Sequence, residues 1–338
     1  MCELFGLTCN KPVGISFTWR GFISGGSRHR DGWGVAFYPD GVSACLIKEP
    51  RPSTSSPMAQ FLKSADLIRS KIIISHVRTA SKGSVTYCNT HPFVRELFGR
   101  EWVFAHNGTI IEEMPRPRFY EPVGKTDSEL AFCLMLDRLR DLGREAGLQE
   151  RARAIEDYAR RFSELSRVFN FLMSDGEHLY AFRSSSGSLY YTVRVPPHRG
   201  LVKLADEDFE VDLSGLKGED EIATIIATRK LTVREDWISL PPERLMIFKD
   251  GLPHLTKEEW SILAYVRRSP HRASIKDISR GVGIDVNEAI GGVIHLKEIG
   301  ILRQDSRDTV PSNHPDATFY TNPEIRRIID SILNHIFS

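Results

Sequence analysis

The stretch MCELFG, residues 1–6, places Cys2 at the second position of the chain, next to the apolar pair Leu4 and Phe5. If Met1 is removed, Cys2 carries a thiol and a free α-amine on the same residue. A cysteine thiol titrates near about pH 8.5 and an α-amine near about 7.7–8.0, so the amine can act as the base for the thiol. We therefore expect Cys2 to be a nucleophile that needs no separate catalytic histidine or aspartate.

The composition is that of an ordinary globular protein. A length of 338 residues favours two domains, and 41% hydrophobic with 26% charged residues excludes a disordered chain. The net charge of +1 indicates no general affinity for nucleic acid. No apolar run is long enough for a membrane span, and the pattern of a signal peptide is missing. Five scattered cysteines without a CxxC pair favour a reducing compartment, so we expect a cytoplasmic protein.

Residues 1–251 are expected to form one domain of short strands with two helical stretches. Apolar residues at helical spacing predict helices over 127–142 and 152–165, and RPSTSSP (51–57) is typical of a loop. Strands before and after the helices favour an α+β fold over a doubly wound parallel sheet. Strands are predicted around residues 72–74, 102–105, 168–173, 179–183, 189–195, 222–228 and 245–248.

Residues 252–338 have a helical pattern and are expected to form a second domain. Thr256 and Glu259 have the spacing of a capping box at the start of a helix. Three short helices, a hairpin and a final helix are typical of a winged helix-turn-helix domain. The later helices are predicted over 274–280, 285–299 and 323–337, and the hairpin strands at 302–304 and 318–321.

Four polar clusters lie at predicted strand ends or in loops, where functional residues concentrate. Each cluster taken alone also has a purely structural interpretation, since Asn-Gly is common in turns and aspartate is a common helix N-cap. The clusters are HRDGWG (29–34), SHVRTAS (75–81), AHNGT (105–109) and GKTDSE (124–129).

Together with Cys2, these clusters supply the groups that amide hydrolysis through a thioester requires. The Asn107 side chain and the Gly108 N–H can stabilise an oxyanion. Arg78 can bind a carboxylate in a bidentate manner, and Asp127 can bind an ammonium group. An α-amino acid with a side-chain carbonyl fits this set, which predicts glutamine or a γ-glutamyl compound as substrate.

Three histidines near strand ends raise the question of a metal site. The spacing of His76, His91 and His106 matches no metal-binding motif, and Arg78 and Lys82 would repel a cation. Neutral histidine that forms hydrogen bonds is the commoner use. We therefore expect neither a metal nor a cofactor.

The ordered motifs MCELFG, HRDGWG, SHVRTAS, NTHPF, AHNG and TDSE resemble the class II glutamine amidotransferases of the N-terminal-nucleophile hydrolase superfamily, and among them the stand-alone, YafJ-like group. The resemblance covers roughly residues 2–250. It implies a four-layer αββα sandwich of two antiparallel sheets between helices. It also implies that Cys2 is nucleophile and base, that Arg78 and Asp127 bind the substrate, and that Asn107 and Gly108 form the oxyanion hole.

The chain departs from the synthetase-linked members of this family in two respects. No sugar-isomerase, phosphoribosyl or nucleotide-binding signature follows the first domain, so either a partner enzyme accepts the ammonia or water is the only acceptor. Thr79 stands where the synthetase-linked family often has an aromatic residue, so closure of the pocket is expected to differ.

The second domain lies outside the resemblance, and two interpretations of it are open. From Leu255 onward, eleven Lys and Arg residues balance eleven Asp and Glu residues, and the predicted recognition helix begins with acidic residues at 285 and 288. These features disfavour DNA binding. They favour partner docking or a homodimer through the apolar final helix. The alternative is a regulator that senses a γ-glutamyl ligand and binds DNA, for which the basic cluster Arg267, Arg268, His271 and Arg272 is the motivation.

Overall fold

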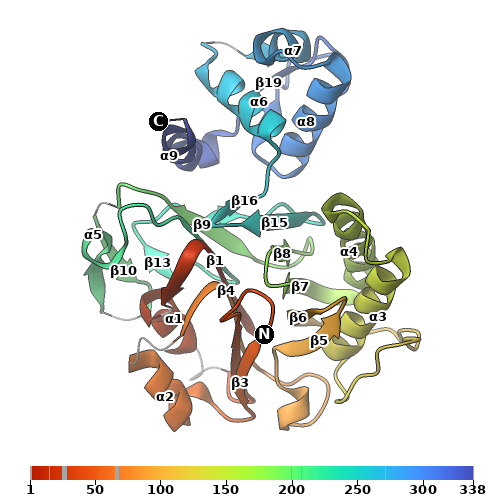
Figure 1. The fold of residues 1–338 in the computed structure, drawn as a ribbon, viewed down its shortest axis with the longest axis vertical. Helices are drawn as coiled ribbons and strands as arrows, with labels where there is room; N and C mark the ends of the chain where they lie inside the picture. Colours follow the sequence, from red (N-terminus) through yellow and green to blue (C-terminus); the bar gives the residue numbers. More distant parts are fainter. Residues whose placement is uncertain are drawn as a thin grey trace. The chain divides into compact units, whose positions relative to one another are not determined.

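The computed structural model describes residues 2–14, 16–24, 29–64, 68–198, 200–206, 208–270 and 272–337, without the side chains of residues 16, 17, 64 and 216. Met1 and His271, which enter the sequence-based predictions, lie outside these ranges. The chain divides into two compact units, Met1–Leu252 (unit 1) and Pro253–Ser338 (unit 2) (Figure 1). Each unit is described by itself.

Unit 1 is built on two large antiparallel sheets. The seven-stranded sheet has the order β14 (Ile238–Ser239), β9 (Tyr190–Arg194), β12 (Ala223–Ala227), β1 (Glu3–Gly14), β4 (Arg69–Val77), β2 (Trp33–Phe37) and β3 (Cys45–Glu49). The six-stranded sheet has the order β16 (Leu252–Pro253), β15 (Leu245–Lys249), β8 (Leu179–Phe182), β7 (Ser166–Ser174), β6 (Arg100–Ile110) and β5 (Phe93–Leu97). A third, small sheet has the order β11 (Glu210–Asp212), β10 (Leu201–Leu204) and β13 (Thr232–Val233).

Strand β1 lies inside the seven-stranded sheet because its alternating side chains are apolar on both faces. Phe5 and Leu7 pack into the core on one side, and Leu4 packs into the core between the two sheets. Gly6 also faces the other sheet, where a Cβ would approach Leu172 of β7 to 2.9 Å. The missing side chain therefore permits the close contact between the sheets that the opening stretch requires.

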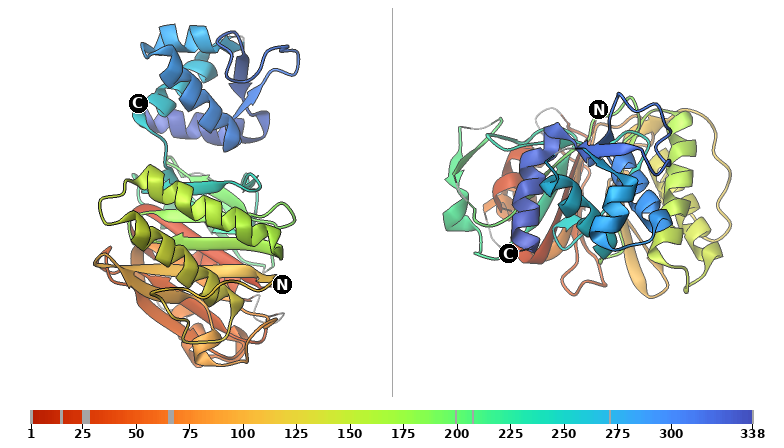
Figure 2. Two further views of the ribbon diagram at one scale, coloured as in Figure 1. Left: turned by 90° about the vertical axis from the view of Figure 1, so that its right-hand side faces the viewer. Right: turned by 90° about the horizontal axis from the view of Figure 1, so that it is seen from above.

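Helices cover the outer faces of both sheets, which produces four layers in the order αββα (Figure 1). Helices α3 (Asp127–Leu142) and α4 (Leu148–Glu164) pack on the six-stranded sheet and are seen face-on in Figure 2, left. Helices α1 (Ser16–Ile23) and α2 (Pro57–Ser64) pack on the seven-stranded sheet. The described part of unit 1 also contains the one-turn helix α5 (Leu213–Leu216).

The prediction of only two helices in the first domain was wrong. Helices α1 and α2 have eight residues each, about two turns, which is too short for a periodic pattern to stand out. The RPSTSSP stretch is not entirely a loop, because η2 (Ser53–Ser55) lies within it and α2 begins at Pro57. By contrast, the helix predicted over 127–142 is confirmed, and the Thr126 side chain caps it by accepting from the Glu129 N–H.

Unit 2 contains four helices of eight or more residues and a small sheet within residues 253–270 and 272–337. The order is α6 (Lys257–Arg268), β17 (Ala273–Ser274), α7 (Ile275–Val282), α8 (Val286–Glu298), β18 (Leu302–Gln304), β19 (Thr318–Thr321), η4 (Pro323–Ile325) and α9 (Arg326–Ile336). Capping boxes start α6, α7 and α8 at Thr256, Ser274 and Asp285. Strand β19 pairs with both β17 and β18.

The apolar residues of the final helix are largely covered within the chain. Ile325, Ile328, Ile329, Ile332 and Leu333 are buried, and Ile336 is exposed. Among the helices of the described ranges, none is long and apolar enough to span a membrane.

Candidate active site

Cys2 lies beside the end of strand β4, where the chain leaves the sheet. Strand β1 pairs with β4 so that Glu3 is opposite Val77, which places Cys2 next to Arg78 and Thr79. The Thr79 N–H donates to Cys2 Sγ over 3.2 Å, and the thiol donates to the Thr79 carbonyl over 3.2 Å. The half-buried thiol is therefore held by main-chain atoms.

Asn107 approaches Cys2 from the opposite sheet. It lies on β6, and its Nδ2 donates to the Cys2 carbonyl oxygen. Asn170 on β7 is paired with Asn107 and donates to Asn107 Oδ1 over 3.2 Å. This second bond fixes which end of the Asn107 amide faces Cys2, because the oxygen is occupied by a donor.

Gly108 has a backbone conformation that excludes a side chain. Its φ is +149°, and a Cβ would lie 1.8 Å from the Val168 carbonyl oxygen and 2.8 Å from His106 Nε2. Glycine is therefore required directly after Asn107 for the neighbouring strands β6 and β7 and the His106 ring to fit.

The buried Arg78 guanidinium is bound by the loop that follows it. Nη1 donates to the Ser84 carbonyl over 3.2 Å, and Nη2 donates to the carbonyls of Lys82 and Gly83 over 3.1 and 3.2 Å. Burial lowers the pKa of Arg78, whereas negative charge at Cys2, Asp31 and Asp127 acts in the opposite direction.

Asp127 is the first residue of α3 and faces the same region. Its Oδ2 accepts from the Ile110 N–H over 2.6 Å, and its Oδ1 accepts from the Ser128 N–H over 3.0 Å. Asp127 influences the electrostatic environment of both Arg78 and His106. The residues predicted from sequence are thus brought together from β1, the end of β4, β6 and the start of α3.

Burial raises the pKa of the Cys2 thiol. The Thr79 N–H and the Arg78 charge act in the opposite direction without cancelling this effect. A thiol with a raised pKa is mostly protonated at neutral pH, and only the thiolate is strongly nucleophilic. A base next to Cys2 is therefore needed for reactivity.

A chain of polar contacts behind Cys2 was not recognised from the sequence. His29 Nδ1 lies 2.8 Å from Thr79 Oγ1, and His29 Nε2 lies 3.2 Å from Glu3 Oε1. Arg229 donates to Glu3 Oε2 over 3.0 Å and forms an ion pair with Asp206. Glu3, His29 and Thr79 stand in the quoted motifs, but Arg229 lies 226 positions from Glu3. Asp206 and Asn170 stand in none of those motifs.

His76, His91 and His106 form a buried layer near the candidate site. The rings of His76 and His91 are 4.2 Å apart, and His106 Nδ1 lies 2.8 Å from Ser128 Oγ. Burial lowers the pKa of His76 to about 3 and that of His106 to about 4, and that of His91 well below its usual range. These histidines are neutral. The parts of the chain that are described contain no group of three or more His, Cys, Asp or Glu arranged to hold a metal ion.

Comparisons with known proteins identify the family. Residues 1–272 match the family model of the class-II glutamine amidotransferases. The uncharacterized protein MJ1515 of Methanocaldococcus jannaschii is 39% identical, covering 98% of this chain and 96% of its own length. YafJ of Escherichia coli is 37% identical, covering 73% of this chain and 97% of its own.

A solved structure has a similar fold. The crystal structure of a predicted glutamine amidotransferase from Pseudomonas aeruginosa PA01 superposes with a TM-score of 0.58 at 32% identity, covering 75% of this chain and 100% of the other. The fold of unit 1 is therefore the glutamine amidotransferase fold, and the chain belongs to the class II glutamine amidotransferase family.

Proposed function

We propose that this protein hydrolyses the side-chain amide of glutamine or of a γ-glutamyl compound through a thioester on Cys2, after removal of Met1. The observation that carries the proposal is the contact of Asn107 Nδ2 with Cys2, which brings an oxyanion donor from one sheet to the thiol-bearing residue of the other. The family and the ordered motifs around these residues support it.

The proposed reaction proceeds in two steps. Cys2 Sγ attacks the amide carbon while the α-amine of Cys2 accepts the thiol proton, and Asn107 Nδ2 with the Gly108 N–H stabilises the oxyanion. The amine then protonates the leaving nitrogen as the C–N bond breaks, which releases ammonia from glutamine and leaves a thioester. Water adds to the thioester carbon, its proton passes to the amine, and the C–S bond breaks to release glutamate and the thiol.

Arg78 and Asp127 are proposed to bind the α-carboxylate and the α-ammonium group of the substrate. Arg78 is positively charged, Asp127 is negatively charged, and the two influence each other electrostatically. Such a pair suits an amino acid that carries both a carboxylate and an ammonium group. The Arg78 bonds to the carbonyls at 82–84 leave part of its donor capacity for a carboxylate, since a guanidinium has five N–H donors.

The acceptor of the ammonia is proposed to be water or a separate partner enzyme. Residues 253–338 carry no sequence signature of a synthetase, so this part of the chain identifies no acceptor. Measuring free ammonia with and without candidate acceptor enzymes distinguishes simple hydrolysis from transfer.

We further propose that unit 2 is a winged helix-turn-helix domain used for docking a partner rather than DNA. The order α6, α7, α8 followed by the β18–β19 hairpin supports the fold assignment. The capping aspartate at 285 and the acidic residue at 288 argue against a DNA-reading role for α8. A homodimer through α9 would have to use side chains other than its four buried apolar residues.

The test combines intact-mass measurement with assays of ammonia and glutamate release. The purified protein is expected to lack Met1 and to hydrolyse glutamine or a member of a γ-glutamyl panel, and Cys2→Ala should lose at least about 10⁴-fold in rate. Cys45→Ala, at a half-buried thiol on β3, is the matched control and should keep full activity. Full activity with Met1 retained, or an active Cys2→Ala protein, would refute the mechanism.

A further inference from the structure

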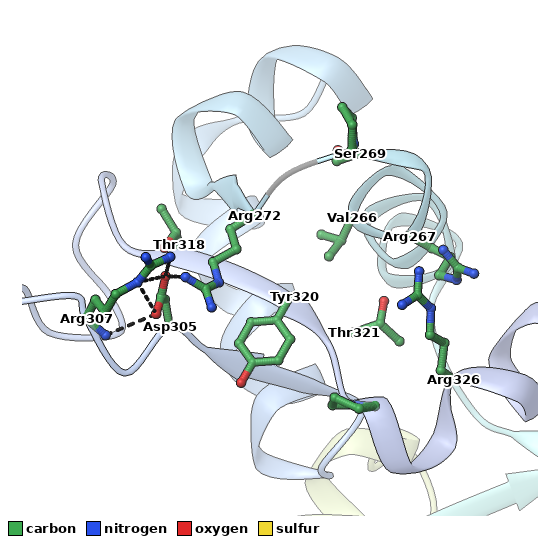
Figure 3. Close-up of a pocket in the computed structure, with 12 residues that line it drawn as sticks. Val266, Arg267, Ser269, Arg272, Asp305, Arg307, Thr318, Tyr320, Thr321 and Arg326 are labelled. Carbon is green, nitrogen blue, oxygen red and sulfur yellow. Dashed lines mark hydrogen bonds and ion pairs between the residues drawn. The ribbon is translucent and has the colours of Figure 1, made fainter.

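A polar cavity of about 580 Å³ lies within unit 2, and its lining contains no residue of the candidate active site (Figure 3). Its volume is within the range of about 300–1,000 Å³ that is usual for small-molecule sites. It is formed by the end of α6, by Ser269, Pro270 and Arg272, by the β18–β19 connection and β19, and by the start of α9. Four of its lining residues are arginines: Arg267, Arg272, Arg307 and Arg326.

The charge of this arginine cavity is not balanced. Arg272 and Arg307 share a single carboxylate, that of Asp305, which also lines the cavity. Arg267 is paired with Asp330. Arg326 is exposed and forms no ion pair with any residue that the structure describes. Positive charge remains in excess even when Asp330 and the nearby Asp308, which do not line the cavity, are counted.

A buried hydroxyl provides a second, independent indication of a ligand. Thr321 lines the cavity, is only 9% exposed, and its Oγ1 has no hydrogen-bond partner among the described residues. Buried hydroxyls are normally bonded, because an unsatisfied one costs free energy. The neighbouring Thr318 hydroxyl is already bonded to Asp308 Oδ1 over 2.9 Å, whereas the buried Thr321 hydroxyl can bond a ligand.

We propose that the arginine cavity binds the phosphate group of a small phosphate monoester. Such a group carries about −1.5 to −2 charges at pH 7 and three acceptor oxygens, which suits the surplus of guanidinium groups. Arginine binds phosphate oxygens with paired N–H donors, and Arg326 has its donors available. The Thr321 hydroxyl then donates to a phosphate oxygen, which satisfies the buried group.

The geometry favours a small molecule over the backbone of a nucleic acid. The lining residues come from α6, β19 and the start of α9, and none comes from α8, the helix that would enter a DNA groove. Binding of duplex DNA relies on a broad basic surface, whereas unit 2 has no net positive charge beyond residue 255.

The experiment is calorimetric titration of the full-length protein with three monoesters that carry different groups: AMP, ribose 5-phosphate and O-phosphoserine. Adenosine and inorganic phosphate are titrated in parallel. We expect at least one monoester to bind with a 1:1 ratio, and more tightly than inorganic phosphate. Arg326→Ala should weaken that binding about 10- to 100-fold and Thr321→Val about 3- to 10-fold.

Arg327→Ala removes an equal charge from the neighbouring, exposed position that does not line the cavity, and should leave the affinity unchanged. Binding of none of the monoesters overturns the proposal, as does an equal loss in Arg326→Ala and Arg327→Ala. Binding of inorganic phosphate alone would identify free phosphate as the ligand instead. Binding of a DNA duplex alone, with a steep salt dependence, would replace the small molecule by nucleic acid.

Discussion

The Cys2 end of unit 1 and the arginine cavity of unit 2 use polar groups in opposite ways. Around Cys2, the thiol, the Asn107 amide and the Asp127 carboxylate all bond to main-chain atoms of neighbouring elements. In the arginine cavity, guanidinium groups outnumber carboxylates and the Thr321 hydroxyl has no partner among the residues described. Bonds to the main chain hold the thiol, the amide and the carboxylate in place, whereas spare donor capacity is what a ligand can use.

This difference predicts that loss of the Asn107 donor at the Cys2 end affects turnover rather than affinity. Asn107→Ala removes the side-chain donor to Cys2, so we expect kcat to fall about 10²- to 10³-fold with a smaller change in KM. Steady-state assay of ammonia release measures both. Asn170→Ala removes the support of Asn107 and the bonds of Asn170 with Ser184 and Ser188 but leaves the Asn107 donor in place, so it should reduce kcat less than Asn107→Ala. A loss of kcat in Asn170→Ala equal to or larger than that in Asn107→Ala would contradict the prediction that Asn107 is the donor and Asn170 its support.

The two units should also differ in their response to acid. An unfolded histidine titrates near about 6.5, whereas His76 and His106 in unit 1 have pKa values of about 3 and about 4. The unfolded chain therefore binds more protons below pH 6.5, and each such histidine removes about 1.4 kcal/mol of stability per pH unit until its folded pKa is reached.

Unit 2 should lose stability only at lower pH. Burial raises the pKa of Glu259, but its bond with His295 outweighs this and holds the pKa below its usual range, so this contribution is lost only below about pH 4.5. Hydrogen exchange at pH 7 and pH 5 measures the opening free energy of each unit, once the observed rates are corrected for the intrinsic exchange rate at each pH. An equal loss of stability in both units between pH 7 and pH 5 would contradict this prediction. So would a His76→Gln variant in which the stability of unit 1 depends on pH as it does in the unchanged protein.

Loss of a contact behind Cys2 should reduce kcat less than loss of a group that touches Cys2 itself. Thr79→Val removes the hydroxyl that bonds His29 but keeps the main-chain contacts with Cys2 Sγ. We expect kcat to fall about 3- to 10-fold, since one hydrogen bond of the supporting chain is lost. Thr79→Ser should restore most of the rate because it keeps a hydroxyl. Loss of activity in Thr79→Ser equal to that in Thr79→Val would show that the methyl group matters instead.

The smallest effect is expected from a helix cap in unit 2. Ser274→Ala removes the capping box of α7 and should cost about 1 kcal/mol in the stability of unit 2, with no change in glutamine hydrolysis. Urea unfolding followed by hydrogen exchange in each unit measures this. An equal loss of stability in unit 1 would contradict the expectation that the two units unfold independently.

The sequence allowed the site residues to be predicted because each stands in a local motif. Asp127 begins α3, and Cys2 and Arg78 stand directly before β1 and directly after β4. Asn107 lies within β6, where a polar residue after an apolar run is also conspicuous. The helices α1 and α2 were missed because each is short and is stabilised by packing on the sheet rather than by a pattern within its own sequence. The contacts of Glu3 with His29 and Arg229 depend on tertiary pairing that no local pattern contains.

The arginine cavity was hidden for the same reason. Its four arginines are spread over 60 positions, and the sequence grouped Arg267 and Arg272 with Arg268 and His271 as a basic run. In the structure, Arg268 instead lies over the Phe337 ring, while Arg307 and Arg326 enter from later elements. The balanced net charge of the second unit therefore concealed a local excess of positive charge at the arginine cavity.

Strand β1 ties the position of Cys2 to the folding of the whole of unit 1. Glu3 is opposite Val77 on one side, and the main-chain groups of Leu4 bond to Thr228 on the other, so Cys2 is anchored directly before a strand with two neighbours. Central strands open only when the whole domain opens. Hydrolysis should therefore persist in rising denaturant until unit 1 unfolds as a whole, so that the remaining enzymatic rate counts the folded molecules.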